Sequence, residues 1–117
     1  MKTILPLLLL SLVLNGTSFM ADQKKELVRE EIKVDGVCSM CKTRIEKAAF
    51  SAKGVKSAQW SVDTHQLNVV YDRAKVSMTQ IEKEIAEVGH NTPNIEAPKA
   101  AYDALPMCCK YLSVEKH

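Results

Sequence analysis

The chain has 117 residues, of which 46% are hydrophobic and 26% charged, and its formal net charge is +2. This length suits one compact domain and leaves no room for a second sizeable core. The near balance of charges and the 5% of aromatic residues exclude a basic, aromatic-rich surface of the kind that binds nucleic acid. No Ser/His/Asp set or paired-carboxylate cleft is evident, so we expect a protein that is not an enzyme.

The first residues form a segment distinct from the rest of the chain. Lys2 precedes an apolar run from Ile4 to Leu14, and small polar residues follow, which is the pattern of a secretory signal peptide. The run is shorter than the about 20 residues that a transmembrane helix needs. We therefore expect residues 1–18 to be a signal peptide, with cleavage between positions 18 and 21, and the mature protein to be periplasmic or secreted. An uncleaved signal would instead anchor the protein in the membrane.

The next part of the chain predicts a strand, a cysteine-containing loop and a helix. Residues 27–34 (LVREEIKV) alternate apolar and polar positions, as in a half-buried strand. Residues 41–54 then predict a helix that stops at Gly54. Its apolar residues at helical spacing are Ile45, Ala48, Ala49 and Ala52.

A hairpin and a second helix follow. Residues 55–62 and 66–72 are strand-like, and the turn residues DTH separate them, so they predict a β-hairpin. Ser77 and Gln80 have the spacing of a capping box and predict the start of a helix that ends at Gly89.

This order of elements predicts an α+β fold. A short fourth strand is expected over residues 92–95, at an edge of the sheet because of Pro93. The resulting β-α-β-β-α-β order is that of a ferredoxin-like sandwich, an antiparallel sheet with two helices on one face. Residues 26–96 would form this domain, and residues 97–117 a C-terminal tail in which a short helical stretch ends before Pro106.

The loop sequence VDGVCSMC places Cys38 and Cys41 three positions apart at the start of the first helix. The free N–H groups and the positive dipole end of a helix stabilise thiolates there. Thiolates are soft ligands that select ions such as Cu(I) and Zn(II). The motif alone leaves three roles open, namely metal binding, thiol–disulfide redox chemistry and a structural disulfide. A thioredoxin-like scaffold needs more chain before the motif than this sequence offers.

The region from about Glu26 to Ile95 resembles the heavy-metal-associated domain of copper chaperones, metal-pumping ATPases and a mercury-binding periplasmic protein. The resemblance rests on VDGVCSMC, the alanine-rich first helix, GVKSAQWSVDTHQLNVVYD and IEKEIAEVGH. It implies that Cys38 and Cys41 capture a soft ion for delivery, transport or detoxification. Cu(I) is the favoured ion, and Hg(II) and Zn(II) are the alternatives. The implied partner is a metal-transporting membrane ATPase or another metal acceptor, and the implied state is a monomer or a metal-bridged dimer.

Two positions depart from the usual pattern of that family. One residue instead of two separates Gly36 from Cys38, and the methionine that the family has in this interval is missing. Met40 lies inside the motif, where we expect it to pack in the core, with a thioether ligand as the alternative. His90 replaces an aromatic residue or a lysine beside the metal loop. The resemblance makes this histidine a candidate third ligand or a donor that tunes the thiolates.

The tail sequence LPMCCKY adds Cys108 and Cys109. Neighbouring side chains diverge in an extended chain, so we do not expect this pair to chelate one ion together or to form a disulfide with each other. If the tail folds back over the loop, either thiol can join Cys38 and Cys41 in a three- or four-sulfur metal site, or lock that site through a disulfide. Mobile thiols are the third alternative. For the whole chain, the alternatives to metal binding are a thiol–disulfide redox protein and a disulfide-stapled interaction domain.

Overall fold

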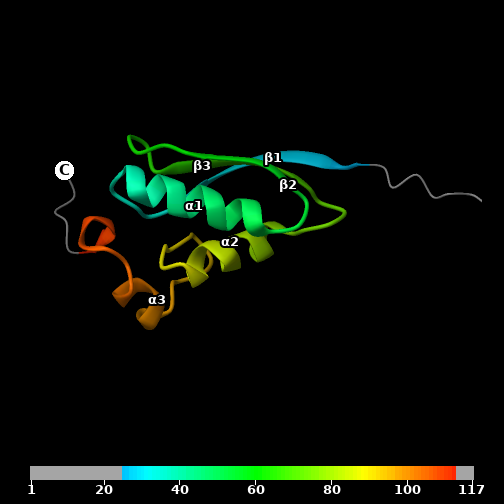
Figure 1. Cartoon of the computed structure of the whole chain (residues 1–117). Coiled ribbons are helices and arrows are strands. Elements are labelled where there is room, and N and C mark those ends of the chain that lie inside the picture. Colours follow the sequence, from blue (N-terminus) through cyan, green and yellow to red (C-terminus); the bar gives the residue numbers. More distant parts are fainter. Residues whose placement is uncertain (1–24, 113–117) are drawn as a thin grey trace, which may run out of the picture.

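The computed structural model describes residues 25–112, so the expected signal peptide lies outside the described residues. The elements are β1 (Leu27–Lys33), α1 (Ser39–Ser51), β2 (Val55–Trp60), β3 (Gln66–Asp72), α2 (Met78–Glu87), α3 (Lys99–Asp103) and the 3₁₀ turn η1 (Met107–Cys109). Both long helices, α1 and α2, cover one face of the sheet (Figure 1). This arrangement confirms the expected α+β, ferredoxin-like fold. Between residues 25 and 112, no helix is long and apolar enough to cross a membrane.

The sheet has the strand order β1-β3-β2, and both pairs of neighbours are antiparallel. The predicted hairpin is confirmed as β2 and β3, in which Trp60 pairs with Leu67. His65 in the connecting turn has a φ of 60°, and its ring stacks on the Trp60 indole with the ring centres 5.5 Å apart. The hairpin therefore brings a large aromatic side chain to the end of the sheet where the cysteine loop lies.

The two helices follow the predicted pattern of buried positions. In α1 the buried residues are Cys41, Ile45, Ala48 and Ala49. The capping box of α2 is confirmed, because the Ser77 side chain accepts a hydrogen bond from the Gln80 backbone and the Gln80 side chain accepts one from the Ser77 backbone. After α2, Gly89 adopts a φ of 105°, a left-handed conformation that favours glycine.

The expected fourth strand over residues 92–95 is wrong. The segment forms a turn instead, in which the Thr92 N–H donates to the Ile95 carbonyl at 3.0 Å. The buried carboxylate of Glu82 in α2 holds this turn, because it accepts hydrogen bonds from Thr92 Oγ1 at 2.7 Å and from the Asn94 backbone at 3.2 Å. These side-chain contacts bend the chain back toward α2 and away from an extended path along the sheet.

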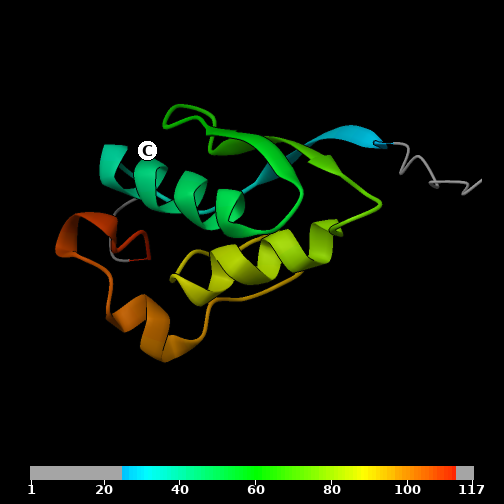
Figure 2. The same cartoon turned by 45° about the vertical axis from the view of Figure 1, so that its right-hand side comes forward.

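The tail folds back along the helices toward the cysteine loop. Figure 1 and Figure 2 both show α3 beyond α2 and the following segment returning to the start of α1. Gly89 permits this path, because a Cβ atom at that position would lie 2.8 Å from the Ala101 carbonyl oxygen and 2.9 Å from the Leu105 side chain. The expected short helix before Pro106 is confirmed as α3.

Candidate metal-binding site

The cysteine loop and the first turn of α1 position the first two thiols. Cys38 is the N-cap residue of α1, with an extended backbone, and is partly buried. Cys41 lies in the first turn and is fully buried. Their Sγ atoms are 3.5 Å apart, and the Val37 N–H donates to Cys41 Sγ at 3.5 Å. The deeper thiol is thus held by the core and the loop backbone, while the other lies nearer the surface.

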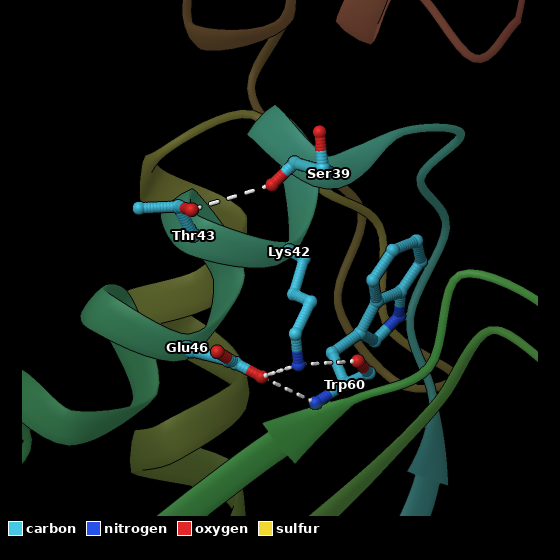
Figure 3. Close-up of polar contacts among 5 residues, drawn as sticks. All are labelled: Ser39, Lys42, Thr43, Glu46 and Trp60. Carbon is cyan, nitrogen blue, oxygen red and sulfur yellow. Dashed lines mark hydrogen bonds and ion pairs between the residues drawn. The ribbon is translucent and has the colours of Figure 1, made fainter.

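A polar clasp fastens α1 to the end of β2 beside this loop (Figure 3). The Glu46 carboxylate accepts a hydrogen bond from the Trp60 N–H at 2.8 Å and forms an ion pair with Lys42. Lys42 in turn donates to the Trp60 carbonyl at 3.0 Å. The clasp ties both backbone polar groups of Trp60 to the helix that carries Cys41.

The Trp60 indole packs directly under the loop. It is 1% exposed, and its Nε1–H donates to the Val34 carbonyl at 3.0 Å. A Cβ atom at Gly36 would lie 2.9 Å from the indole ring and 3.1 Å from the Cβ of Cys41. Trp60 therefore belongs to the sheet and at the same time supports the cysteine loop. The close approach explains the glycine just before the motif.

The tail places Cys109 against the loop. Its Sγ lies 3.8 Å from Cys38 Sγ, and the residue is fully buried. Cys108 is exposed, and its Sγ lies 4.0 Å from that of Cys109. The assumption that the two adjacent side chains diverge is wrong, because η1 is a 3₁₀ turn and not an extended segment. The donor atoms of Cys38, Cys108 and Cys109 all lie within 4.8 Å of one another.

Tyr111 fastens the tail in this position. Its hydroxyl donates to the Gly89 carbonyl at 2.8 Å and accepts a hydrogen bond from the Asn91 N–H at 3.1 Å. Burial raises the pKa of Tyr111 to about 12, although the bond from Asn91 lowers it, so the hydroxyl keeps its proton and stays a donor. Sequence reasoning missed this residue; an aromatic residue two positions after the cysteine pair was the only available signal.

His90 is fully buried and forms a hydrogen bond with the backbone of the cysteine loop. Its ring Nδ1 donates to the Asp35 carbonyl at 2.7 Å, and the Asp35 N–H donates to the Asn91 carbonyl at 3.0 Å. Burial lowers the pKa of His90, the Asp35 carbonyl raises it, and the Arg44 charge lowers it. Nε2 is buried and has no hydrogen-bond partner. Over residues 25–112, the group of potential metal ligands that lie close together contains no histidine. The role of His90 as a metal ligand therefore stays a prediction.

Met40 does not pack in the core, and that expectation is wrong. The residue is 52% exposed, and its Sδ lies 3.3 Å from Cys108 Sγ. The first turn of α1 directs this side chain to the surface, whereas Cys41, one position later, turns inward.

The thiols Cys38 and Cys109 differ in acidity. Burial raises the pKa of Cys38, but hydrogen bonds from the Cys41 and Met40 backbones and from the Cys41 and Cys109 thiols outweigh it and bring the pKa to about 7. Burial raises the pKa of Cys109 well above its usual range, and the neighbouring thiols raise it further. The loop therefore offers one thiolate near neutral pH, beside a thiol that keeps its proton until an ion displaces it.

The spacing of the sulfurs suits a soft metal ion. A bond of about 2.3 Å between an ion and each thiolate puts the sulfurs of a three- or four-coordinate site about 4 Å apart. The separations of 3.5 Å between Cys38 and Cys41, 3.8 Å between Cys38 and Cys109, and 4.0 Å between Cys108 and Cys109 are close to this value. All four cysteines are free thiols in this structure. Among the described residues, the three ligand atoms that lie mutually within 4.8 Å are those of Cys38, Cys108 and Cys109, and Cys41 joins them through its 3.5 Å contact with Cys38.

Fold and sulfur cluster together define a heavy-metal-binding domain. Residues 31–91 match the family model of the heavy-metal-associated domain, and the chain belongs to that family. The copper chaperone CopZ of Staphylococcus haemolyticus is 32% identical over 66 residues, which are 56% of this chain and 97% of that protein. The family match ends before the tail, so Cys108 and Cys109 lie beyond it.

Two further comparisons agree with this assignment. A zinc-transporting ATPase of Synechocystis sp. is 36% identical over 69 residues, which are 58% of this chain but only 10% of the ATPase. The solved structure of a CopZ metallochaperone has a TM-score of 0.54 at 32% identity and covers 56% of this chain and 98% of the chaperone. The matched region thus spans nearly the whole of the small chaperone but only 10% of the much larger transporter.

Proposed function

We propose that the protein captures Cu(I) in a site formed by Cys38, Cys41 and Cys109. The observation that carries this proposal is the position of the buried Cys109 thiol 3.8 Å from Cys38. Three converging sulfurs without carboxylates favour a soft ion. The copper chaperone relative supports Cu(I), and the zinc-transporting relative keeps Zn(II) as the second candidate, with Hg(II) as the third.

Capture is a ligand exchange that needs no catalytic base. Cys38, which is partly exposed and ionises near neutral pH, takes the ion first. Cys41 in the helix start then binds as the anchored ligand, and Cys109 completes the site. Each thiol that binds the ion releases its proton to solvent, so metal binding becomes tighter as the pH rises.

The tail favours retention over rapid delivery. In transfer between two such domains, a thiolate of the acceptor must reach the ion, and η1 lies over the loop that it would approach. We propose that the exported protein holds Cu(I) in the periplasm or outside the cell, and gives it to a membrane metal ATPase or another acceptor after the tail is displaced. It acts as a monomer, or as a metal-bridged dimer when the tail is open.

An anaerobic Cu(I) titration of the reduced chain against a competing chelator tests this proposal. Cys38→Ser should weaken binding of the first ion at least about a hundredfold, the equivalent of about 2.7 kcal/mol. Cys109→Ser should keep one ion per chain but bind it about tenfold more weakly, since two thiolates remain. Met107→Leu is the matched control, because this tail side chain is 84% exposed. Unchanged affinity in Cys38→Ser would refute the site.

The predicted role of His90 as a ligand needs its own variant. His90→Asn can still donate to the Asp35 carbonyl but lacks Nε2, the atom that has no partner in the structure. If Nε2 binds the ion, this variant loses Cu(I) affinity, whereas an affinity equal to that of the wild type contradicts the ligand role and leaves His90 as a support for the loop. His90→Ala removes both nitrogen atoms. Its loss of thermal stability measures the support that His90 gives to the loop, separately from any role as a metal ligand.

A further inference from the structure

The sulfur atoms of this protein continue beyond the three thiols of the proposed site. Cys108 Sγ lies 4.0 Å from Cys109 Sγ on one side and 3.3 Å from Met40 Sδ on the other. The sulfurs therefore form one connected series, which runs from the buried Cys41 through Cys38, Cys109 and Cys108 to Met40.

The outer end of this series is open to solvent. Cys108 is exposed, and Met40 is 52% exposed, whereas Cys41 and Cys109 are fully buried. Met40 belongs to the first turn of α1 and Cys108 to η1, so two segments far apart in the sequence present one sulfur each at the same place. The inner site proposed above uses neither sulfur, although Cys108 Sγ lies within 4.8 Å of the Cys38 and Cys109 sulfurs.

We propose that Cys108 and Met40 form a second, outer Cu(I) site, adjacent to the inner one, with Cys109 as the thiolate that the two ions share. This inference rests on the proposed function of the inner site. A thiolate together with a thioether is a soft donor set that suits Cu(I). A thiolate sulfur has more than one lone pair and can bind two soft ions, and Cys109 Sγ lies 3.8 Å from Cys38 Sγ and 4.0 Å from Cys108 Sγ. The protein thus holds two Cu(I) ions per chain.

Filling the outer site is a simple exchange of a proton for a metal ion. Cu(I) forms a bond to Cys108 Sγ, the thiol proton leaves to solvent, and Met40 adds its neutral thioether without losing a proton. No electron is transferred, and copper stays in the Cu(I) state. Binding of the second ion therefore releases one proton, that of Cys108. Cys109 has already released its proton to solvent on binding the first ion.

Native mass spectrometry of the reduced chain, loaded anaerobically with Cu(I) in the presence of a competing chelator, tests the outer site. We expect two ions per monomer in the wild type and one in Cys108→Ser, with the affinity for the first ion changed less than about threefold. Met40→Leu should weaken binding of the second ion at least about tenfold. This exposed side chain tolerates leucine without a change in the core, and Met107→Leu, in the same tail, should keep both ions.

The outcomes separate the two proposals. One tightly bound ion in the wild type overturns the outer site but leaves the inner site standing. Two ions in Cys108→Ser also overturn it, as does an unchanged second affinity in Met40→Leu. If the wild type binds no Cu(I) at all, the proposed function itself fails. Two ions seen only in a dimer, one for each chain, count against the outer site because no chain then holds both.

Discussion

Cys38 Sγ and Cys109 Sγ lie 3.8 Å apart although the two residues are 71 positions apart in the chain. One thiol lies within the region that matches the family model, and the other lies in a tail beyond that region. The buried contact joins the two into one cluster of sulfurs. The loop that carries Cys38 and Cys41 is thus covered by a third thiol from the same chain.

The Cys38 thiol should react at neutral pH. Its pKa of about 7 means that the thiolate is the minor form at pH 6 and the major form at pH 8, so the rate of alkylation by iodoacetamide should rise through this interval with its midpoint near pH 7. Mass spectrometry of the digested protein identifies the modified cysteine. Cys109 provides the internal control, because it is buried and its pKa is raised, and it should stay unmodified. A midpoint for Cys38 near the ordinary value of about 8.5 would contradict the prediction.

Removal of the Tyr111 hydroxyl should release the tail. Tyr111→Phe loses the bond to the Gly89 carbonyl and leaves the Asn91 N–H without its acceptor, which should lower the free energy of unfolding by about 1–3 kcal/mol. Urea unfolding measures this change, and hydrogen exchange of the tail amides should become faster. Tyr102→Phe is the control, because its hydroxyl accepts an exposed bond from the Leu112 N–H, whose loss should cost under about 0.5 kcal/mol. Equal effects of the two variants would argue against Tyr111 as the fastening residue.

The close packing of Gly36 against Trp60 gives a paired test. Gly36→Ala places a methyl group 2.9 Å from the indole, so it should cost about 1–3 kcal/mol of stability through overpacking. It should also weaken metal binding, because the displaced loop carries Cys38. Trp60→Phe removes the outer ring that the methyl group meets, so in a double-mutant cycle the two changes should cost less together than the sum of their separate effects. Simple additivity would mean that the contact does not decide the loop position.

Glu82 should prove important for the turn that replaces the fourth strand. Glu82→Ala removes the acceptor for Thr92 Oγ1 and for both nitrogen groups of Asn94, and should lower the free energy of unfolding by about 1–2 kcal/mol. Thermal unfolding followed by circular dichroism measures the change. Glu87→Ala, at an exposed position of the same helix, should stay within about 0.5 kcal/mol of the wild type. If both variants unfold alike, the carboxylate does not hold the turn.

The sequence by itself determined the order of the elements up to the second helix and the position of the first two thiols. Alternation in β1, the capping box of α2 and the glycine that follows α2 are local signals, readable within a few residues, whereas α1 ends at Ser51, before the predicted stop at Gly54. The placement of two cysteines at a helix start is equally local, since the motif and the helix periodicity lie side by side in the chain.

Only the tertiary structure decided the rest. The expected fourth strand does not form, because Glu82, ten residues from Thr92, holds that segment in a turn. The tail reaches the loop because Gly89 leaves room for it and Tyr111 fastens it, contacts that no local pattern encodes. The 3₁₀ turn η1 then places the two tail sulfurs 4.0 Å apart, with Cys109 buried and Cys108 exposed. Short-range periodicity sets secondary structure, whereas the completion of the sulfur cluster depends on packing between distant segments.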